Sequence, residues 1–75
     1  MAKANGAAIQ ALREAKHMSA SELARRAGVT RQHLGRIERG ECGASDTVIQ
    51  STAAALQVPA AAISYEIPEP VGATR

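Results

Sequence analysis

The chain has almost no aromatic side chains: its 75 residues include one tyrosine and neither tryptophan nor phenylalanine. Much of its 45% hydrophobic content is alanine, so large apolar side chains are scarce as well. A chain of this length forms one domain at most, and such a domain buries only about 60% of its unfolded surface. These limits argue against a deep substrate pocket, because little volume remains beside the core.

Cysteine is nearly absent too, since Cys42 is the only one. A single thiol forms no internal disulfide, which suits a reducing cytosol. Cys42 and the two distant histidines, His17 and His33, lack the spacing of zinc ligands. No apolar run reaches the length of a membrane span or a secretory signal. We therefore expect a cytoplasmic protein that binds no metal, cofactor or membrane.

Acidic residues are scarce in the first half of the chain, and basic residues are scarce in the second half. Residues 1–40 carry eight Lys or Arg against three Glu, whereas residues 41–75 carry one Arg against four acidic residues. This asymmetry suggests an anionic partner for the basic half, although a mixed solvated surface explains the charges equally well. No close Ser, His and acid set, no suggestive carboxylate pair and no glycine-rich phosphate loop occurs, so we do not expect an enzyme.

Apolar spacing, caps and helix breakers predict an all-α chain of five helices. The predicted helices cover residues 5–17, 20–27, 31–39, 45 or 46 to 57, and 60–64. Ser19 caps the second helix and forms a capping box with Glu22. Pro59 suits the first turn of the fifth helix. We expect residues 1–6 to be an N-terminal arm, residues 7–64 the domain, and residues 65–75 an extended or disordered tail.

The second and third predicted helices carry the informative pattern. Only residues 28–30 separate them, and two helices joined by a three-residue turn with glycine are typical of a helix-turn-helix. This motif spans residues 19–39. On the third helix Leu34 and Ile37 mark the packed face, and the opposite face carries Gln32, Gly35, Arg36 and Arg39. Arginine and glutamine match the edges of guanine and adenine, so this face suits the major groove of DNA.

The stretch LREAKHMSASELARRAGVTRQHLGRIERGE resembles the phage-repressor-type (Xre/Cro-like) helix-turn-helix family, and the resemblance extends over about residues 7–64. It implies a compact, five-helix, lambda-repressor-like DNA-binding domain. The positions that match the family's base-contacting residues are Arg31, Gln32 and Arg36. Positions that match backbone or secondary DNA contacts are Ser19, Ala20, Ser21, Thr30, His33, Arg39, Gly43 and Ser45. The family's structural ion pair matches Arg13 and Glu38.

The chain departs from the family pattern at several positions. Asp46, Gln50 and Thr52 stand where the fourth helix is usually apolar, so that region is either loosely packed or faces a partner. Glu41 replaces the basic residues common after the third helix, which should weaken phosphate attraction there. Gln57 stands at the family's usual glycine.

The resemblance implies a small transcriptional regulator of the Cro or repressor type, from a phage or prophage, that binds double-stranded DNA sequence-specifically. We expect a homodimer on a palindromic operator, with no small-molecule ligand. Ile63, Tyr65 and Ile67 have little else to cover them and could form the dimer contacts; their alternation also permits a short edge strand. The alternatives are an antitoxin-like autoregulator that binds a partner protein, and a protein–protein adaptor that reuses the fold.

Overall fold

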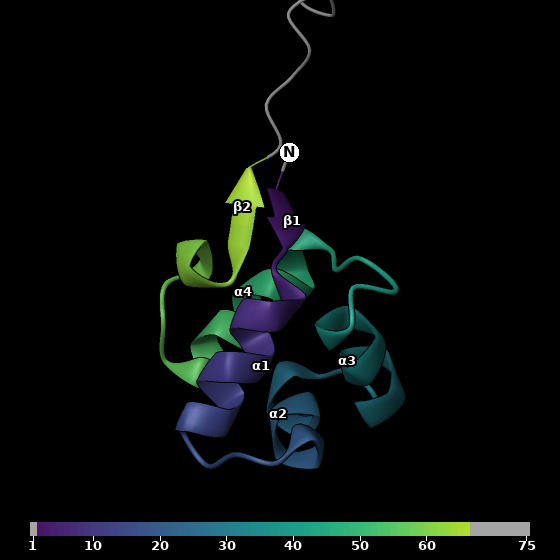
Figure 1. The fold of residues 1–75 in the computed structure, drawn as a ribbon, viewed down its shortest axis with the longest axis vertical. Coiled ribbons are helices and arrows are strands. Elements are labelled where there is room, and N and C mark those ends of the chain that lie inside the picture. The colour runs from purple at the N-terminus through teal and green to yellow at the C-terminus, as the bar shows by residue number, and fades with distance from the viewer. Residues whose placement is uncertain (1, 67–75) are drawn as a thin grey trace, which may run out of the picture.

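The computed structural model describes residues 2–66, which form four α-helices, one short 3₁₀ turn and a pair of strands (Figure 1). The elements in chain order are β1 (Ala2–Ala4), α1 (Gly6–Ala15), α2 (Ala20–Ala27), α3 (Arg31–Glu38), α4 (Asp46–Leu56), η1 (Ala60–Ala62) and β2 (Ser64–Glu66). No helix in this described part has the length and apolarity that crossing a bilayer requires.

The prediction of a fifth helix over residues 60–64 is wrong. Only η1 forms there, and Pro59 precedes it at φ −67° instead of occupying its first turn. The hydroxyl of Ser64 donates to the carbonyl oxygen of Ala60 at 2.8 Å, which closes the turn. After this turn the chain becomes extended and forms β2, because residues 64–66 pair with β1 instead of continuing a helix.

The two strands join the ends of the described chain. β1 and β2 pair antiparallel, with Lys3 opposite Tyr65 and Ala4 opposite Ser64. The amide of Asn5 continues this contact by donating to the carbonyl oxygen of Ile63 at 2.8 Å. Figure 1 shows the pair at one end of the molecule, beyond α1 and α4. Residues 2–6 of the predicted arm and residues 65–66 of the predicted tail are therefore parts of the described fold.

An aliphatic core lies between the helices. The buried cluster consists of Ile9, Leu23, Ala24, Leu34, Ile37, Ile49, Ala53, Leu56 and Ile63. Thr52 is also buried, with 1% of its surface exposed, so this departure from the family pattern is a packed position. Ile63, one of the three predicted dimer contacts, is fully buried within its own chain. Tyr65 is 48% exposed, and Ile67 lies outside the described residues.

Side-chain caps begin every α-helix. The capping residues Asn5, Ser19, Thr30 and Ser45 each accept a hydrogen bond from the backbone amide three residues later. The capping box at α2 is only half formed, because the Glu22 carboxylate accepts from Arg26 at 2.6 Å and does not bond back to Ser19. α1 ends at Ala15, two residues earlier than predicted, since His17 takes the left-handed conformation at φ 55°.

Candidate nucleic-acid interface

The turn between α2 and α3 is closed by backbone geometry. Gly28 adopts the left-handed conformation, with φ 78° and ψ 26°, where glycine avoids the steric penalty of a Cβ atom. The amide of Val29 donates to the carbonyl oxygen of Ala24 at 3.0 Å, and the Thr30 hydroxyl then accepts from the His33 amide at 3.0 Å. Only residues 28–30 therefore separate α2 from α3, as the sequence pattern predicted.

α3 divides into two faces. Its inner face buries Leu34 and Ile37 in the core, where α3 packs against α1 and α2. The side chains exposed on the remaining surface belong to Arg31, Gln32, His33, Arg36 and Arg39. The three predicted base-contacting residues, Arg31, Gln32 and Arg36, thus share the exposed surface of one short helix.

Most of the predicted backbone contacts lie at or near the starts of α2, α3 and α4, and Arg39 lies at the end of α3. Ser19 and Ser21 are exposed at the start of α2, where Ala20 is half-buried, and Thr30 is exposed at the start of α3. Gly43 and the α4 cap Ser45 are also exposed. Because the first amides of a helix have no intrahelical acceptor and carry partial positive charge, these ends can bind anions such as phosphate.

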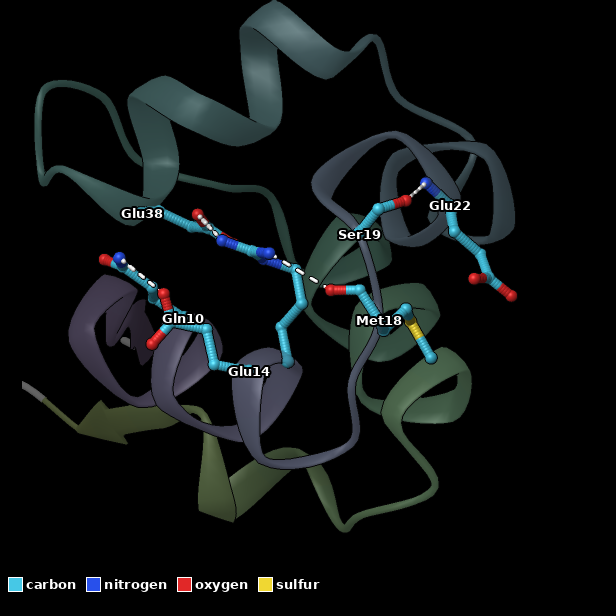
Figure 2. Close-up of polar contacts among 7 residues, drawn as sticks. Gln10, Glu14, Met18, Ser19, Glu22 and Glu38 are labelled. Carbon is cyan, nitrogen blue, oxygen red and sulfur yellow. Dashed lines mark hydrogen bonds and ion pairs between the residues drawn. The ribbon is translucent and has the colours of Figure 1, made fainter.

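An ion pair joins α1 to the end of α3. Arg13 donates from Nε to Oε2 of Glu38 at 2.8 Å and from Nη2 to Oε1 at 3.2 Å, and from Nη1 to the carbonyl oxygen of Met18 at 3.1 Å (Figure 2). The side chains are only 14% and 7% exposed, respectively. The hydrogen bond to Glu38 raises the pKa of Arg13. This pair fixes the C-terminal end of α3 against α1.

A close backbone approach supports the same junction, and sequence reasoning missed it. A methyl group on Gly6, the first residue of α1, would overlap the carbonyl oxygens of Ile37 and Glu38. Only glycine therefore lets α1 approach the end of α3 so closely. Its position at a helix start was the available signal, but that position alone does not reveal which segment lies opposite.

A second ion pair lies on the outer surface, and sequence reasoning missed this pairing as well. Arg39 donates from Nε to Oε2 of Glu41 at 2.9 Å and from Nη2 to Oε1 at 3.3 Å, with side-chain exposures of 60% and 55%. The hydrogen bond from Arg39 lowers the pKa of Glu41, and the charge of Arg36 adds to this effect. The Glu41 carboxylate therefore pairs with Arg39, one of the arginines on the exposed surface next to α3.

Comparisons with known proteins agree with this geometry. The helix-turn-helix family model HTH_3 matches residues 9–63. The restriction-modification controller protein C.AhdI from Aeromonas hydrophila is 33% identical, with a TM-score of 0.74 over 76% of this chain and 86% of that chain. The clp gene regulator ClgR from C. glutamicum is 32% identical, with a TM-score of 0.71 over 75% of this chain and 73% of that chain.

A structure of SinR, the master regulator for biofilm formation, was solved in complex with DNA. SinR is 36% identical, with a TM-score of 0.69 over 73% of this chain and 89% of that chain. Comparison with curated proteins gave no match. The family model covers well over half of the chain, including both helices of the motif and the helices that support them. The chain therefore belongs to the helix-turn-helix family HTH_3 and has the fold of that family's transcriptional regulators.

Proposed function

We propose that this protein is a transcriptional regulator that reads double-stranded DNA by inserting α3 into the major groove. The observation that carries the proposal is the division of α3, whose large apolar side chains are buried while Arg31, Gln32 and Arg36 are exposed together. Arginine pairs bidentately with guanine, and glutamine with adenine, so these side chains suit base edges. The likeness to SinR, solved in complex with DNA, supports the same role.

The surrounding helix ends would position α3 on the duplex. Ser19, Ala20 and Ser21 begin α2, and their amides and hydroxyls suit one backbone phosphate. Thr30 and His33 lie at the start of α3, where they suit the backbone or a neighbouring base. Gly43 and Ser45 would contact the backbone on the other side of α3, beyond Arg39.

A homodimer on a palindromic operator is the form we propose for binding. Specific protein–DNA interfaces bury about 1,000–2,500 Å² of protein surface, which one small domain supplies with difficulty. Two copies would place their α3 helices in successive major grooves about 34 Å apart. The exposed Tyr65 on β2 is the candidate dimer contact that remains within the described residues. We further propose that the protein represses transcription by occupying its site, as a phage or prophage regulator of the Cro or repressor type.

Selection of bound duplexes from a random pool tests this function. At about 150 mM salt, where non-specific attraction is already weakened, we expect an inverted repeat with a fixed half-site spacing. Recovery of single half-sites would remove the dimer from the proposal. A pool without any preferred sequence would contradict base reading, and would favour a partner protein as the target of α3.

Arg36→Ala then tests the assignment of base contacts. We expect a loss of about 1–3 kcal/mol on the selected site, with relaxed preference at one base position. Arg25→Ala is the matched control, because it removes an exposed arginine from α2 and should leave the base preference unchanged. An equal loss on every sequence would instead assign Arg36 to a phosphate.

A further inference from the structure

The chain reverses at the end of α3 in a way that brings a carboxylate back to the helix. Gly40 adopts the left-handed conformation at φ 76°, and the amide of Glu41 donates to the carbonyl oxygen of Arg36 at 2.8 Å. This turn directs the Glu41 side chain at Arg39, with which it makes its two hydrogen bonds. The pairing is therefore built into the local backbone.

Gly35 provides the surface over which the Arg39 guanidinium lies. A methyl group at Gly35 would be 3.2 Å from Nη1 of Arg39, and the nearest atoms around that position all belong to the Arg39 side chain. Glycine in the middle of a helix costs about 1 kcal/mol relative to alanine. Here it leaves room for the Arg39 guanidinium to lie over residue 35 of α3.

The Arg39 guanidinium is suited to a phosphate. Its planar fork binds carboxylates and phosphates through the same bidentate geometry, and Glu41 occupies that fork in the free protein. In docked helix-turn-helix proteins the N-terminal residues of the recognition helix contact base edges. Arg39, at the opposite end of α3, would then lie at the margin of the groove, where the phosphate backbone runs.

We propose that Glu41 holds Arg39 across Gly35 in the free protein and that a DNA backbone phosphate displaces Glu41 from Arg39 on binding. Glu41 is thus an internal competitor that lowers affinity for all DNA. This inference rests on the proposed DNA-binding function. The exchange is feasible because both side chains are more than half exposed, and water and salt screen such surface pairs strongly.

The competitor role differs from simple repulsion between Glu41 and DNA. Repulsion would act on the whole duplex whether or not Arg39 is present. Competition acts only through Arg39, so the effect of removing the Glu41 charge must depend on that residue. A double-mutant cycle over Arg39 and Glu41 distinguishes competition from repulsion. It measures how far the effect of one substitution on DNA affinity depends on the presence of the other.

The experiment measures fluorescence anisotropy of a labelled duplex with the wild-type protein, Glu41→Gln, Arg39→Ala and the double variant, from about 50 to 200 mM salt. The duplex is the site obtained by selection. We expect Glu41→Gln to raise affinity about two- to fivefold, the range that the loss of one exposed ion pair allows. In the Arg39→Ala background the same substitution should change affinity by less than about half as much on a logarithmic scale. Arg39→Ala alone should lower the salt slope by about 0.9, as expected for one lost phosphate contact.

Asp46→Asn is the matched control. Asp46 is an exposed acid just beyond the same loop, and it makes no ion pair within residues 2–66. Asp46→Asn should raise affinity less than Glu41→Gln and by the same factor with or without Arg39. Equal gains from Glu41→Gln in both backgrounds, no gain at all, or an unchanged salt slope in Arg39→Ala would each overturn the competitor role while leaving DNA binding intact. A selection that recovers no bound duplex with the wild-type protein would overturn the proposed function as well.

Discussion

The inner and outer faces of α3 carry the same two chemical features in opposite environments. Each face has a bidentate arginine–glutamate pair, with side chains 14% and 7% exposed in the inner pair and 60% and 55% exposed in the outer pair. Each also has a glycine beside it. The comparison teaches that burial decides the role of the pair: on the inner side it holds the helix in place, and on the outer side it can be exchanged for another anion.

The two glycines differ in the same manner. At Gly6 the nearest atoms are backbone atoms of Ile37 and Glu38, which cannot move without shifting α3. At Gly35 the nearest atoms belong to the flexible Arg39 side chain, which can move freely into solvent. The inner face is therefore rigid and intolerant of added volume, whereas the outer face is adjustable.

Removal of the Glu38 carboxylate from the inner pair should have the largest effect on stability. Glu38→Ala leaves the Arg13 charge buried without its partner, and we expect a loss of about 3–5 kcal/mol in the free energy of unfolding, measured by urea denaturation. Glu41→Ala is the outer control and should shift the denaturation midpoint far less, because its pair with Arg39 is exposed to solvent. If Glu38→Ala and the wild-type protein had similar midpoints, the inner pair would stabilise the fold no more than the outer pair does.

A methyl group added at Gly6 should cause the next largest loss of stability. Gly6→Ala forces α1 away from the end of α3, and overpacking of this kind costs about 1–3 kcal/mol. Thermal unfolding followed by circular dichroism measures the change. Gly43→Ala is the control, because no atom lies within 4 Å of the added methyl group there. If the two variants melted together, the close approach of α1 to α3 would not constrain the fold.

The same substitution on the outer face should act in the opposite direction. Gly35→Ala should stabilise the protein by about 1 kcal/mol through helix propensity, since only the Arg39 side chain must yield. We also expect Glu41→Gln to change DNA affinity less in this variant, because Arg39 no longer lies across residue 35. A destabilised Gly35→Ala protein would show that the outer face is as tightly packed as the inner one.

The smallest effect on stability should be the titration of Glu41. The hydrogen bond from Arg39 lowers the pKa of Glu41, so the pair stabilises the fold at neutral pH and loses that contribution as pH falls through the lowered pKa. Carboxyl carbon-13 NMR should find a midpoint below the ordinary value for glutamate, and Arg39→Ala should raise it. An identical midpoint in both proteins would mean that the outer pair does not form in solution.

Local signals predicted the motif well. Ser19, Gly28 and Thr30 act on the adjoining backbone, so cap and turn chemistry located α2, the turn and α3 within one residue of their observed bounds. The periodicity of α3 likewise predicted which of its side chains are exposed, because Leu34 and Ile37 are its only large apolar residues. The DNA contacts assigned to those exposed side chains remain predictions.

Features that depend on distant segments were not predictable in this way. The residues of β1 are Ala-Lys-Ala, which have little strand propensity, and their partners lie some sixty positions away in the sequence. The alanines after Pro59 favour a helix locally, but pairing of the following residues with β1 overrides that preference. The Arg13–Glu38 pair was expected only from family resemblance, and the neighbours of Gly6 depend on how α1 meets α3.

The near absence of aromatic residues makes the molecule spectroscopically simple. Tyr65, the only tyrosine in a chain without tryptophan, lies on β2 opposite Lys3. Its emission therefore reports the environment of the strand pair, while far-ultraviolet circular dichroism is dominated by the helices. One unlabelled sample thus carries separate optical signals for the joined chain ends and for the helical body. Coincident transitions would mean that both unfold as one cooperative unit, and an earlier fluorescence transition would identify the strand pair as a separate, weaker one.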